Sequence, residues 1–123
     1  MFKRETGLNF IDIHCHILPD MDDGPSRLEE SIEMLSQAKK DGVSHIFATP
    51  HIIEGLYANR AGGIISSVEK LRSHLPEGLW LHYGADVRVT PDLPGRIKAK
   101  EVPTLDDSGY LLVELPDYIV PPN

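Results

Sequence analysis

Apolar runs that alternate with segments of helical periodicity constrain the fold of this chain more than any other feature of its sequence. Four runs are typical of short strands, at residues 9–14, 43–49, 79–83 and 110–115. Helices are predicted between them, at about 27–41, 64–75 and 92–100. Strands that alternate with helices pair in parallel, with the helices as crossover connections. We therefore expect an α/β fold of about four parallel strands buried on both faces, as an open sheet or as part of a (β/α) barrel.

The first predicted helix has recognisable start and stop signals. Ser26 is expected to be its N-cap, and Glu29, three residues later, closes a capping box. Gly42 stands where a C-terminal stop is expected. Apolar residues recur between these signals at helical spacing, at Leu28, Ile32, Leu35 and Ala38. This pattern predicts a helix that covers the sheet.

An imidazole or a carboxylate follows or ends each of the four predicted strands. These side chains belong to His14, His16, His51, Asp86 and Glu114. In α/β sheets and barrels, active sites are built at the carboxyl ends of the strands. The recurrence at four successive strands therefore predicts that these side chains converge on one site.

The spacing around the first strand suits a metal ion. In an extended chain alternate side chains share a face, so Asp12, His14 and His16 are expected on one face, and Ile13 and Cys15 on the other. Two imidazoles on one face can hold one cation. Asp12 is then placed to accept the outer ring N–H of a ligand histidine.

Plainer interpretations stand beside the metal site. Residues 22–25, Asp-Asp-Gly-Pro, form either an ordinary turn or a loop that brings a carboxylate over the strand ends. His51 and Asp86 each fit a turn as well as a ligand position. Glu114 is harder to explain without a cation, because it lies in an apolar strand and a buried, unpaired carboxylate is costly.

The remaining candidate groups are expected to have structural or surface roles. The other histidines are His45, His74 and His82, which we interpret as structural or exposed. Cys15 is expected to be a small packed residue and not a nucleophile. Arg60 and Arg88 could bind phosphate by their charge, although a solvated surface position is the plainer interpretation for each.

Composition excludes several classes of function. The 123 residues suit one domain, and 12 basic against 19 acidic residues give a net charge of -7. This balance argues against nucleic acid and anionic membrane surfaces as partners. No apolar run approaches the roughly 20 residues that span a bilayer, and the polar start carries no visible secretory signal. The single cysteine excludes an internal disulfide and suits a reducing cytoplasm.

Taken together, the motifs resemble the PHP (polymerase and histidinol phosphatase) superfamily, and within it the CpsB/CapC-type bacterial tyrosine-protein phosphatases of capsule and exopolysaccharide regulation. The similar segments are 12–19, 22–24, 29–31, 48–51, 83–86, 103–105 and 112–114. The resemblance implies an incomplete (β/α) barrel with up to three divalent ions, usually Mn²⁺, with Fe or Zn as alternatives.

The resemblance also assigns residue roles. It implies that His14 and His16 hold one metal, that Asp23 and His51 serve another, and that Asp86 bridges two, while Glu114 completes the site. The implied partner is a phosphotyrosine protein, such as a bacterial tyrosine autokinase of polysaccharide export. The implied location is the cytoplasm, and an open sheet edge makes homo-oligomers possible.

Two departures from the family pattern leave alternatives open. The family usually has Glu where this chain has Asp86, and its members are about twice as long. Their second half supplies a further His, an Asp-x-His pair and a phosphate-binding arginine, so residues 1–123 are expected to form one partial domain that lacks the C-terminal half of the barrel. The alternatives are a non-catalytic metal-binding or interaction fragment, or another PHP chemistry such as histidinol-phosphate hydrolysis or a polymerase-associated nuclease.

Overall fold

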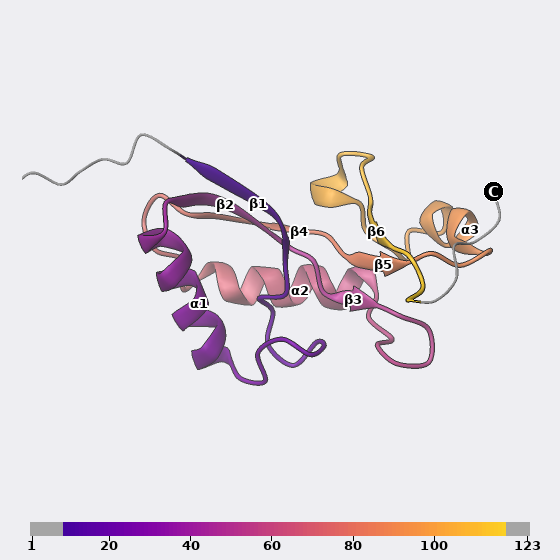
Figure 1. Ribbon diagram of the computed structural model, residues 1–123, viewed down its shortest axis with the longest axis horizontal. Coiled ribbons are helices and arrows are strands. Elements are labelled where there is room, and N and C mark those ends of the chain that lie inside the picture. The colour runs from indigo at the N-terminus through magenta and orange to yellow at the C-terminus, as the bar shows by residue number, and fades with distance from the viewer. Residues whose placement is uncertain (1–8, 118–123) are drawn as a thin grey trace, which may run out of the picture.

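The computed structural model describes residues 9–117 as parallel strands connected by helices (Figure 1). The strands are β1 (Phe10–Cys15), β2 (Val43–Ala48), β3 (His51–Ile52), β4 (Trp80–Tyr83), β5 (Asp86–Arg88) and β6 (Leu112–Glu114). The helices are α1 (Leu28–Lys40), α2 (Ala61–Arg72) and α3 (Leu93–Lys98), with a short 3-10 helix, η1 (Leu105–Asp107). All the ladders between these strands are parallel, so the predicted α/β class is confirmed.

The strands form two three-stranded sheets, in the orders β1-β2-β4 and β3-β5-β6. β3 follows β2 after only Thr49 and Pro50, and β5 follows β4 after only Gly84 and Ala85. Pro50 has no N–H for a ladder, and its carbonyl accepts a hydrogen bond from the Asp86 N–H at 2.9 Å. The four predicted strands are therefore present, but the second and third continue past their predicted ends as β3 and β5.

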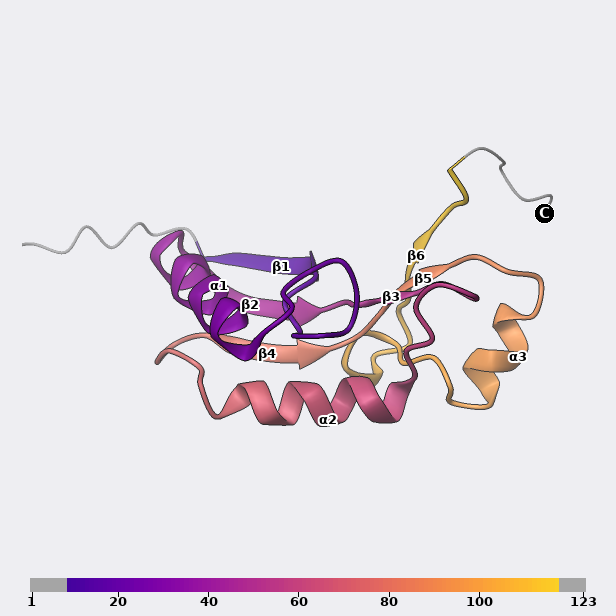
Figure 2. The same cartoon turned by 90° about the horizontal axis from the view of Figure 1, so that it is seen from below.

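The hydrophobic core lies between the β1-β2-β4 sheet and the helices α1 and α2. Both helices lie below these strands in Figure 1, and Figure 2 shows α2 alongside β4. Contacts join α1 to β2, α2 to β4, and the two helices to each other. The fully buried side chains in this layer include Leu35, Ile46, Ala48, Ile64, Val68, Leu71 and Leu81. The predicted helical stripes thus provide the core. Within residues 9–117, no helix is long and apolar enough to cross a membrane.

The start of α1 differs from the prediction. The N-cap is Arg27, with extended backbone and no side-chain capping hydrogen bond, so the capping box predicted at Ser26 and Glu29 is wrong. The Ser26 hydroxyl donates instead to Glu30 Oε1 at 2.9 Å. The hydroxyl therefore bonds to a side chain in the first turn of the helix and does not cap a backbone N–H.

The outer face of the β1-β2-β4 sheet is open in the part of the chain that the structure describes. Phe10, Ile11, Ile13 and Trp80 are each between 51% and 61% exposed. The expectation that strands are buried on both faces is therefore wrong for β1 and β4. The physical reason is that α1 and α2 pack against the opposite face only.

The register of β1 shifts between Asp12 and Cys15. Asp12 pairs with Ile46 and Cys15 pairs with Ala48, so a stretch of three residues in β2 faces a stretch of four in β1. Because Ile46 and Ala48 point to the same face of β2, Asp12 and Cys15 share a face. The strict alternation predicted around His14, with Asp12 and Cys15 on opposite faces, is therefore wrong.

Candidate metal centre

Short strands bring the predicted ligands to one end of the sheet. His51 opens β3 and Asp86 opens β5, and these two residues are direct partners in the parallel ladder. Glu114 ends β6 beside them, paired with Arg88. His14 lies at the end of β1. The ladders therefore fix the backbone of these ligands, which places the predicted convergence in the sheet and not in flexible loops.

The first group of possible ligands consists of His14, His16 and Asp86. The two Nε2 atoms of the histidines are 3.1 Å apart. Asp86 Oδ2 lies 3.3 Å from His14 Nε2 and 3.6 Å from His16 Nε2. Donor atoms held about 2.0–2.2 Å from one divalent ion lie roughly 3.0–3.5 Å from each other. The 3.1 Å and 3.3 Å distances fall in this range and the 3.6 Å distance lies just above it, so the group is close to the spacing of a shared cation.

The second group consists of His51, Asp86 and Glu114. His51 Nδ1 lies 3.3 Å from Asp86 Oδ2 and 3.0 Å from Glu114 Oε1. The same Asp86 oxygen thus belongs to both groups. Asp86 is 2% exposed, and its other oxygen, Oδ1, is buried without a hydrogen-bond partner among the described residues. A buried carboxylate with an unsatisfied oxygen is costly unless a cation neutralises it.

The acidic loop, residues 20–25, adds a third group. His16, Asp22, Asp23 and His51 each offer a donor atom within 4.8 Å of the others. Asp23 Oδ1 lies 3.5 Å from His51 Nε2, and the Asp23 side chain is 66% exposed. The loop lies close to the chain that follows β1. A Cβ on Gly24 would lie only 2.5 Å from the His16 carbonyl oxygen. The ligand interpretation of this loop therefore has structural support beyond turn chemistry.

Asp22 makes the most hydrogen bonds in the acidic loop. Its Oδ2 accepts from His16 Nδ1 at 2.8 Å and from the His51 N–H at 2.9 Å. Its Oδ1 accepts from the Gly24 N–H at 2.9 Å. Burial by itself raises the pKa of Asp22, but the hydrogen bonds from His16, His51 and Gly24 outweigh it and lower the pKa. Nothing in the sequence separates Asp22 from its neighbour Asp23, so this role was missed.

Asp12 has a different contact from the one predicted. Its Oδ1 accepts the backbone N–H of His14 at 3.0 Å, and its pairing with Ile46 places it on the helix-covered face. The carboxylate on a ligand ring nitrogen is that of Asp22, on His16. The shift in the register of β1 explains this difference, because it turns Asp12 away from the face that the alternation predicted.

Glu114 and Arg88 lie side by side at the edge of the centre. The Glu114 side chain is 25% exposed, so the carboxylate is less buried than predicted and water reaches it. Arg88 Nε lies 4.0 Å from Glu114 Oε1 and is buried without a hydrogen-bond partner among the described residues. Arg60, by contrast, is paired with Glu101 at 2.9 Å.

Two residues after β3 support His51 and were not predicted. The Tyr57 ring stacks on the His51 ring, with centroids 5.6 Å apart and planes 13° apart. Asn59 Nδ2 donates to the carbonyl oxygens of His51 and Met21, both at 2.8 Å. These contacts tie the segment after β3 to the acidic loop. A sequence signal for them is absent, because Tyr and Asn at these positions are ordinary loop residues.

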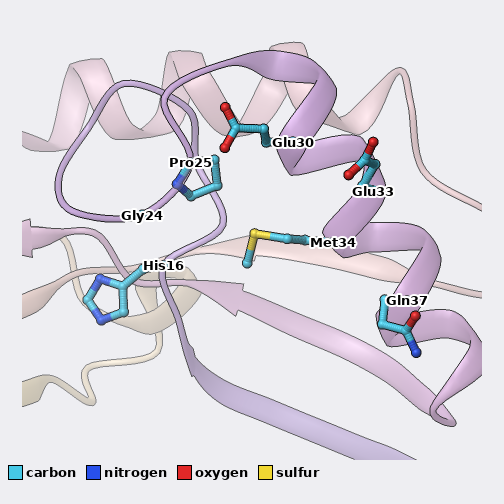
Figure 3. A pocket seen from close by; sticks show the side chains of 7 residues that line it. All are labelled: His16, Gly24, Pro25, Glu30, Glu33, Met34 and Gln37. Atoms are coloured by element: carbon cyan, nitrogen blue, oxygen red, sulfur yellow. The ribbon is translucent and has the colours of Figure 1, made fainter.

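A groove of about 520 Å³ opens beside His16 (Figure 3). One wall is the acidic loop, at Gly24 and Pro25, and the other is the face of α1. The side chains of α1 that line it are Glu30, Glu33, Met34 and Gln37. Of the first group of possible ligands, His16 is the member that lines this groove.

Histidines outside the centre pair with each other. His45 Nδ1 and His82 Nε2 are 2.9 Å apart, and His82 Nδ1 lies 3.4 Å from Asp106 Oδ2. Burial lowers the pKa of His82, although the charge of Asp106 opposes this effect. His74 is exposed. The interpretation of these three histidines as structural or exposed therefore agrees with their surroundings.

Cys15 is partly buried against the core. Burial, together with the nearby charge of Asp12, raises the pKa of its thiol to about 12. A thiol with so high a pKa is almost entirely protonated at neutral pH and is a poor nucleophile. The interpretation of Cys15 as a packed residue agrees with this environment.

Comparisons with known proteins point to one family. The model of the family described as capsular polysaccharide synthesis, CpsB/CapC, matches residues 10–119. The tyrosine-protein phosphatase YwqE of Bacillus subtilis is 37% identical over 114 residues, which are 90% of this chain and 45% of that protein. The tyrosine-protein phosphatase CpsB of Streptococcus pneumoniae is 36% identical over 107 residues, which are 85% of this chain and 44% of that protein.

A solved structure shares the fold. It comes from crystal structures of YwqE and CpsB, described as unique metal-dependent tyrosine phosphatases, and matches with a TM-score of 0.85 and 35% identity. The match covers 91% of this chain and 47% of that chain. The predicted resemblance and fold are thereby confirmed. The chain spans about half the length of the curated relatives it matches.

Proposed function

Because the chain belongs to the CpsB/CapC family, we propose that it carries the N-terminal half of a metal-dependent site that hydrolyses phosphotyrosine in proteins. The observation that carries this proposal is the meeting of three imidazoles with the buried, half-unsatisfied carboxylate of Asp86. A bound cation would satisfy the free oxygen of Asp86 and neutralise its charge. The relatives named tyrosine-protein phosphatases support the choice of reaction.

We assign the ligand roles as follows. His14 and His16 hold one divalent ion, His51 and Asp23 serve another, and Asp86 bridges two ions, with Glu114 completing the site. Up to three ions are proposed because the donor atoms form three overlapping groups. Mn²⁺ is the proposed metal, with Fe or Zn as alternatives, because mixed imidazole and carboxylate donors suit all three.

The residues of the chain orient the reactants. Divalent ions bound here would lower the pKa of a bound water and offset the charge of the phosphate. His14 and His16 present their Nε2 atoms toward Asp86 and thus toward the shared cation position. Tyrosine leaves as a phenolate, which is a better leaving group than an alkoxide, so a cysteine nucleophile is unnecessary and Cys15 takes no part.

Arg88 is the proposed phosphate-binding residue within this chain. Its Nε is buried near Glu114 without a hydrogen-bond partner among the described residues, and the side chain as a whole is 29% exposed. A partly exposed guanidinium at the edge of the ligand groups can donate to a phosphate oxygen. Arg88→Lys, which keeps the charge and loses the planar donor pair, should raise KM for a phosphotyrosyl peptide more than it lowers kcat.

The test of the proposed function combines metal content with turnover. The purified chain is loaded with Mn²⁺, its bound metal is measured by mass spectrometry, and hydrolysis of a phosphotyrosyl peptide is followed. We expect His14→Ala to lower both the bound metal and the hydrolysis, and the exposed His74→Ala, the matched control, to leave both unchanged. Hydrolysis that survives exhaustive chelation would refute the proposal.

The proposed physiological substrate is a phosphotyrosine protein of capsule or exopolysaccharide synthesis, such as a bacterial tyrosine autokinase, in the cytoplasm. The relatives are tyrosine-protein phosphatases, which supports phosphotyrosine as the substrate, and the capsular polysaccharide synthesis family supports the link to capsule synthesis. A substrate panel distinguishes this reaction from other PHP chemistry. Preference for histidinol phosphate over a phosphotyrosyl peptide would overturn the choice.

The open sheet face favours a second candidate function, that of a metal-binding fragment that acts by association. Ile11 and Trp80 are both 61% exposed on that face. Large apolar side chains left in water promote association with another polypeptide or a second copy of this chain. Light scattering on the Mn²⁺-loaded chain tests this candidate, and a monomer with full phosphatase turnover would defeat it.

A further inference from the structure

We propose that Asp22 is a positioning residue that fixes the ring of His16 in its metal-binding tautomer and ties the backbone of His51 to it. The inference rests on the proposed metal centre and adds a residue to which no ligand role was assigned. In this arrangement Asp23 supplies the free carboxylate of the acidic loop, and Asp22 does not ligate.

The hydrogen bonds of Asp22 occupy both of its oxygens. Oδ2 accepts from His16 Nδ1 at 2.8 Å and from the His51 N–H at 2.9 Å, and Oδ1 accepts from the Gly24 N–H at 2.9 Å. The side chain is 1% exposed. A carboxylate that already accepts three N–H groups in a buried position has little capacity left for a cation. Asp23, 66% exposed, has that capacity.

The contact with His16 determines which ring nitrogen carries the proton. An ionised carboxylate only accepts hydrogen bonds, so the nitrogen that faces it, Nδ1, must be the N–H. In the neutral ring the lone pair is then on Nε2. That atom lies 3.1 Å from His14 Nε2 and 3.6 Å from Asp86 Oδ2, inside the first ligand group. His16 is therefore prepared for a cation before one binds.

The contact with His51 couples two ligands from different strands. His16 follows β1 and His51 opens β3, and a single oxygen of Asp22 joins the ring of one to the backbone of the other. The two imidazole centroids lie only 4.4 Å apart. A shift of the acidic loop would therefore move both ligands, so Asp22 sets their separation as well as their orientation.

The direct test reads the tautomer of His16 by long-range ¹H–¹⁵N NMR of the metal-free chain at about pH 8. In the wild type we expect a protonated Nδ1 and an unprotonated Nε2. Asp22→Ala removes the acceptor that faces Nδ1, so the preference for the Nδ1 proton should be lost and the share of rings with the proton on Nε2 should rise. The matched control is Asp20→Asn, an exposed residue of the same loop whose positive φ of 56° suits Asn.

The second readout is the affinity for Mn²⁺ by isothermal titration calorimetry. Loss of a group that orients a ligand histidine typically lowers metal affinity about 10–100-fold, and we expect this loss for Asp22→Ala, with Asp20→Asn unchanged. Asp22→Glu, which keeps the acceptor, should restore the Nδ1 proton at least in part. Circular dichroism checks that each variant is folded.

The outcomes separate the two proposals. A wild-type His16 whose proton is on Nε2 would refute the positioning role without any variant. Unchanged tautomer and affinity in folded Asp22→Ala would refute it as well. A wild-type chain with the expected tautomer but no bound Mn²⁺ would leave the positioning role of Asp22 supported and overturn the proposed metal function instead.

Discussion

Replacement of Gly24 by alanine tests whether the acidic loop is held against His16 by steric fit. A Cβ at this position would lie 2.5 Å from the His16 carbonyl oxygen and 3.1 Å from Asp22 Oδ1. The first of these neighbours is backbone at the end of β1, which cannot rotate away as a side chain can. The loop itself must therefore move.

The size of the movement follows from the contact. Ordinary van der Waals contact begins at 3.4 Å, so the loop must retreat by about 0.9 Å. Overpacking of this kind typically costs about 1–3 kcal/mol of stability. The same displacement pulls Asp22 from His16 and Asp23 from His51, and a misplacement near 1 Å in a site can cost about 100-fold. We expect the Mn²⁺ affinity of Gly24→Ala to fall by about 10–100-fold.

The control uses a glycine with free space. Gly63 lies in α2, and a Cβ there would meet no heavy atom within 4 Å. Gly63→Ala should leave the Mn²⁺ affinity unchanged and raise the free energy of unfolding by about 0.5–1 kcal/mol, because alanine loses less backbone entropy in a helix. The two variants thus carry the same added methyl group with opposite expected effects on stability.

The assay is calorimetric titration of Mn²⁺ for affinity, with urea unfolding of the metal-free chain for stability. A Gly24→Ala chain that binds Mn²⁺ like the wild type, at unchanged stability, would refute the steric argument. Loss of affinity at unchanged stability would locate the effect in the ligands alone. Equal losses of affinity in Gly24→Ala and Gly63→Ala would show that the assay reports a general disturbance, and the reasoning would fail.

Three further predictions concern the rest of the fold. Leu35→Ala, at a fully buried side chain, should lower the free energy of unfolding by about 2–5 kcal/mol. Met34→Ala, at a side chain that is 37% exposed, should lower it much less, and urea denaturation of the two variants measures the difference. Cys15, with its pKa near 12, should react slowly with iodoacetamide at pH 7.5 and rapidly in urea, and rapid labelling of the native chain would contradict its packing. Burial lowers the pKa of His82 below the usual 6.5, so the neutral ring contributes stability above pH 6.5 that is lost as the pH falls. The free energy of unfolding, measured from pH 6.5 to about 5, should therefore depend less on pH in His82→Gln than in the wild type.

The sequence was sufficient for the class of fold and for the strands that carry the ligands. Apolar runs and helical spacing are local signals, and Leu35 of α1 and Val68 of α2 are buried as their spacing predicted. Pro50 and Gly84 predict strand ends, but in each case the chain resumes a strand after two residues. Whether a strand resumes after two residues depends on the neighbour that pairs with it, as His51 does with Asp86, and that neighbour is distant in sequence.

The predicted convergence of side chains is present, while their roles as metal ligands stay a prediction. His14, His16, His51, Asp86 and Glu114 meet because parallel strands end together. The register shift in β1, which depends on how that strand pairs with β2, cannot be read from alternation alone. For the same reason the supporting carboxylate was assigned to a residue of the strand, although it comes from the loop.

The division of the strands into two sheets separates mutations that move the proposed ligands from mutations that change only the neighbouring surface. The ladder of β3, β5 and β6 fixes His51, Asp86 and Glu114, while the segments that continue from β3 and β5 leave the ladder within a few residues. Mutations at 54–56 and 90–92 can therefore change the surface beside the ladder without removing the contact of Tyr57 with His51 or that of Val89 with Glu114. Changes in these segments can therefore accumulate while the positions of His51, Asp86 and Glu114 stay fixed.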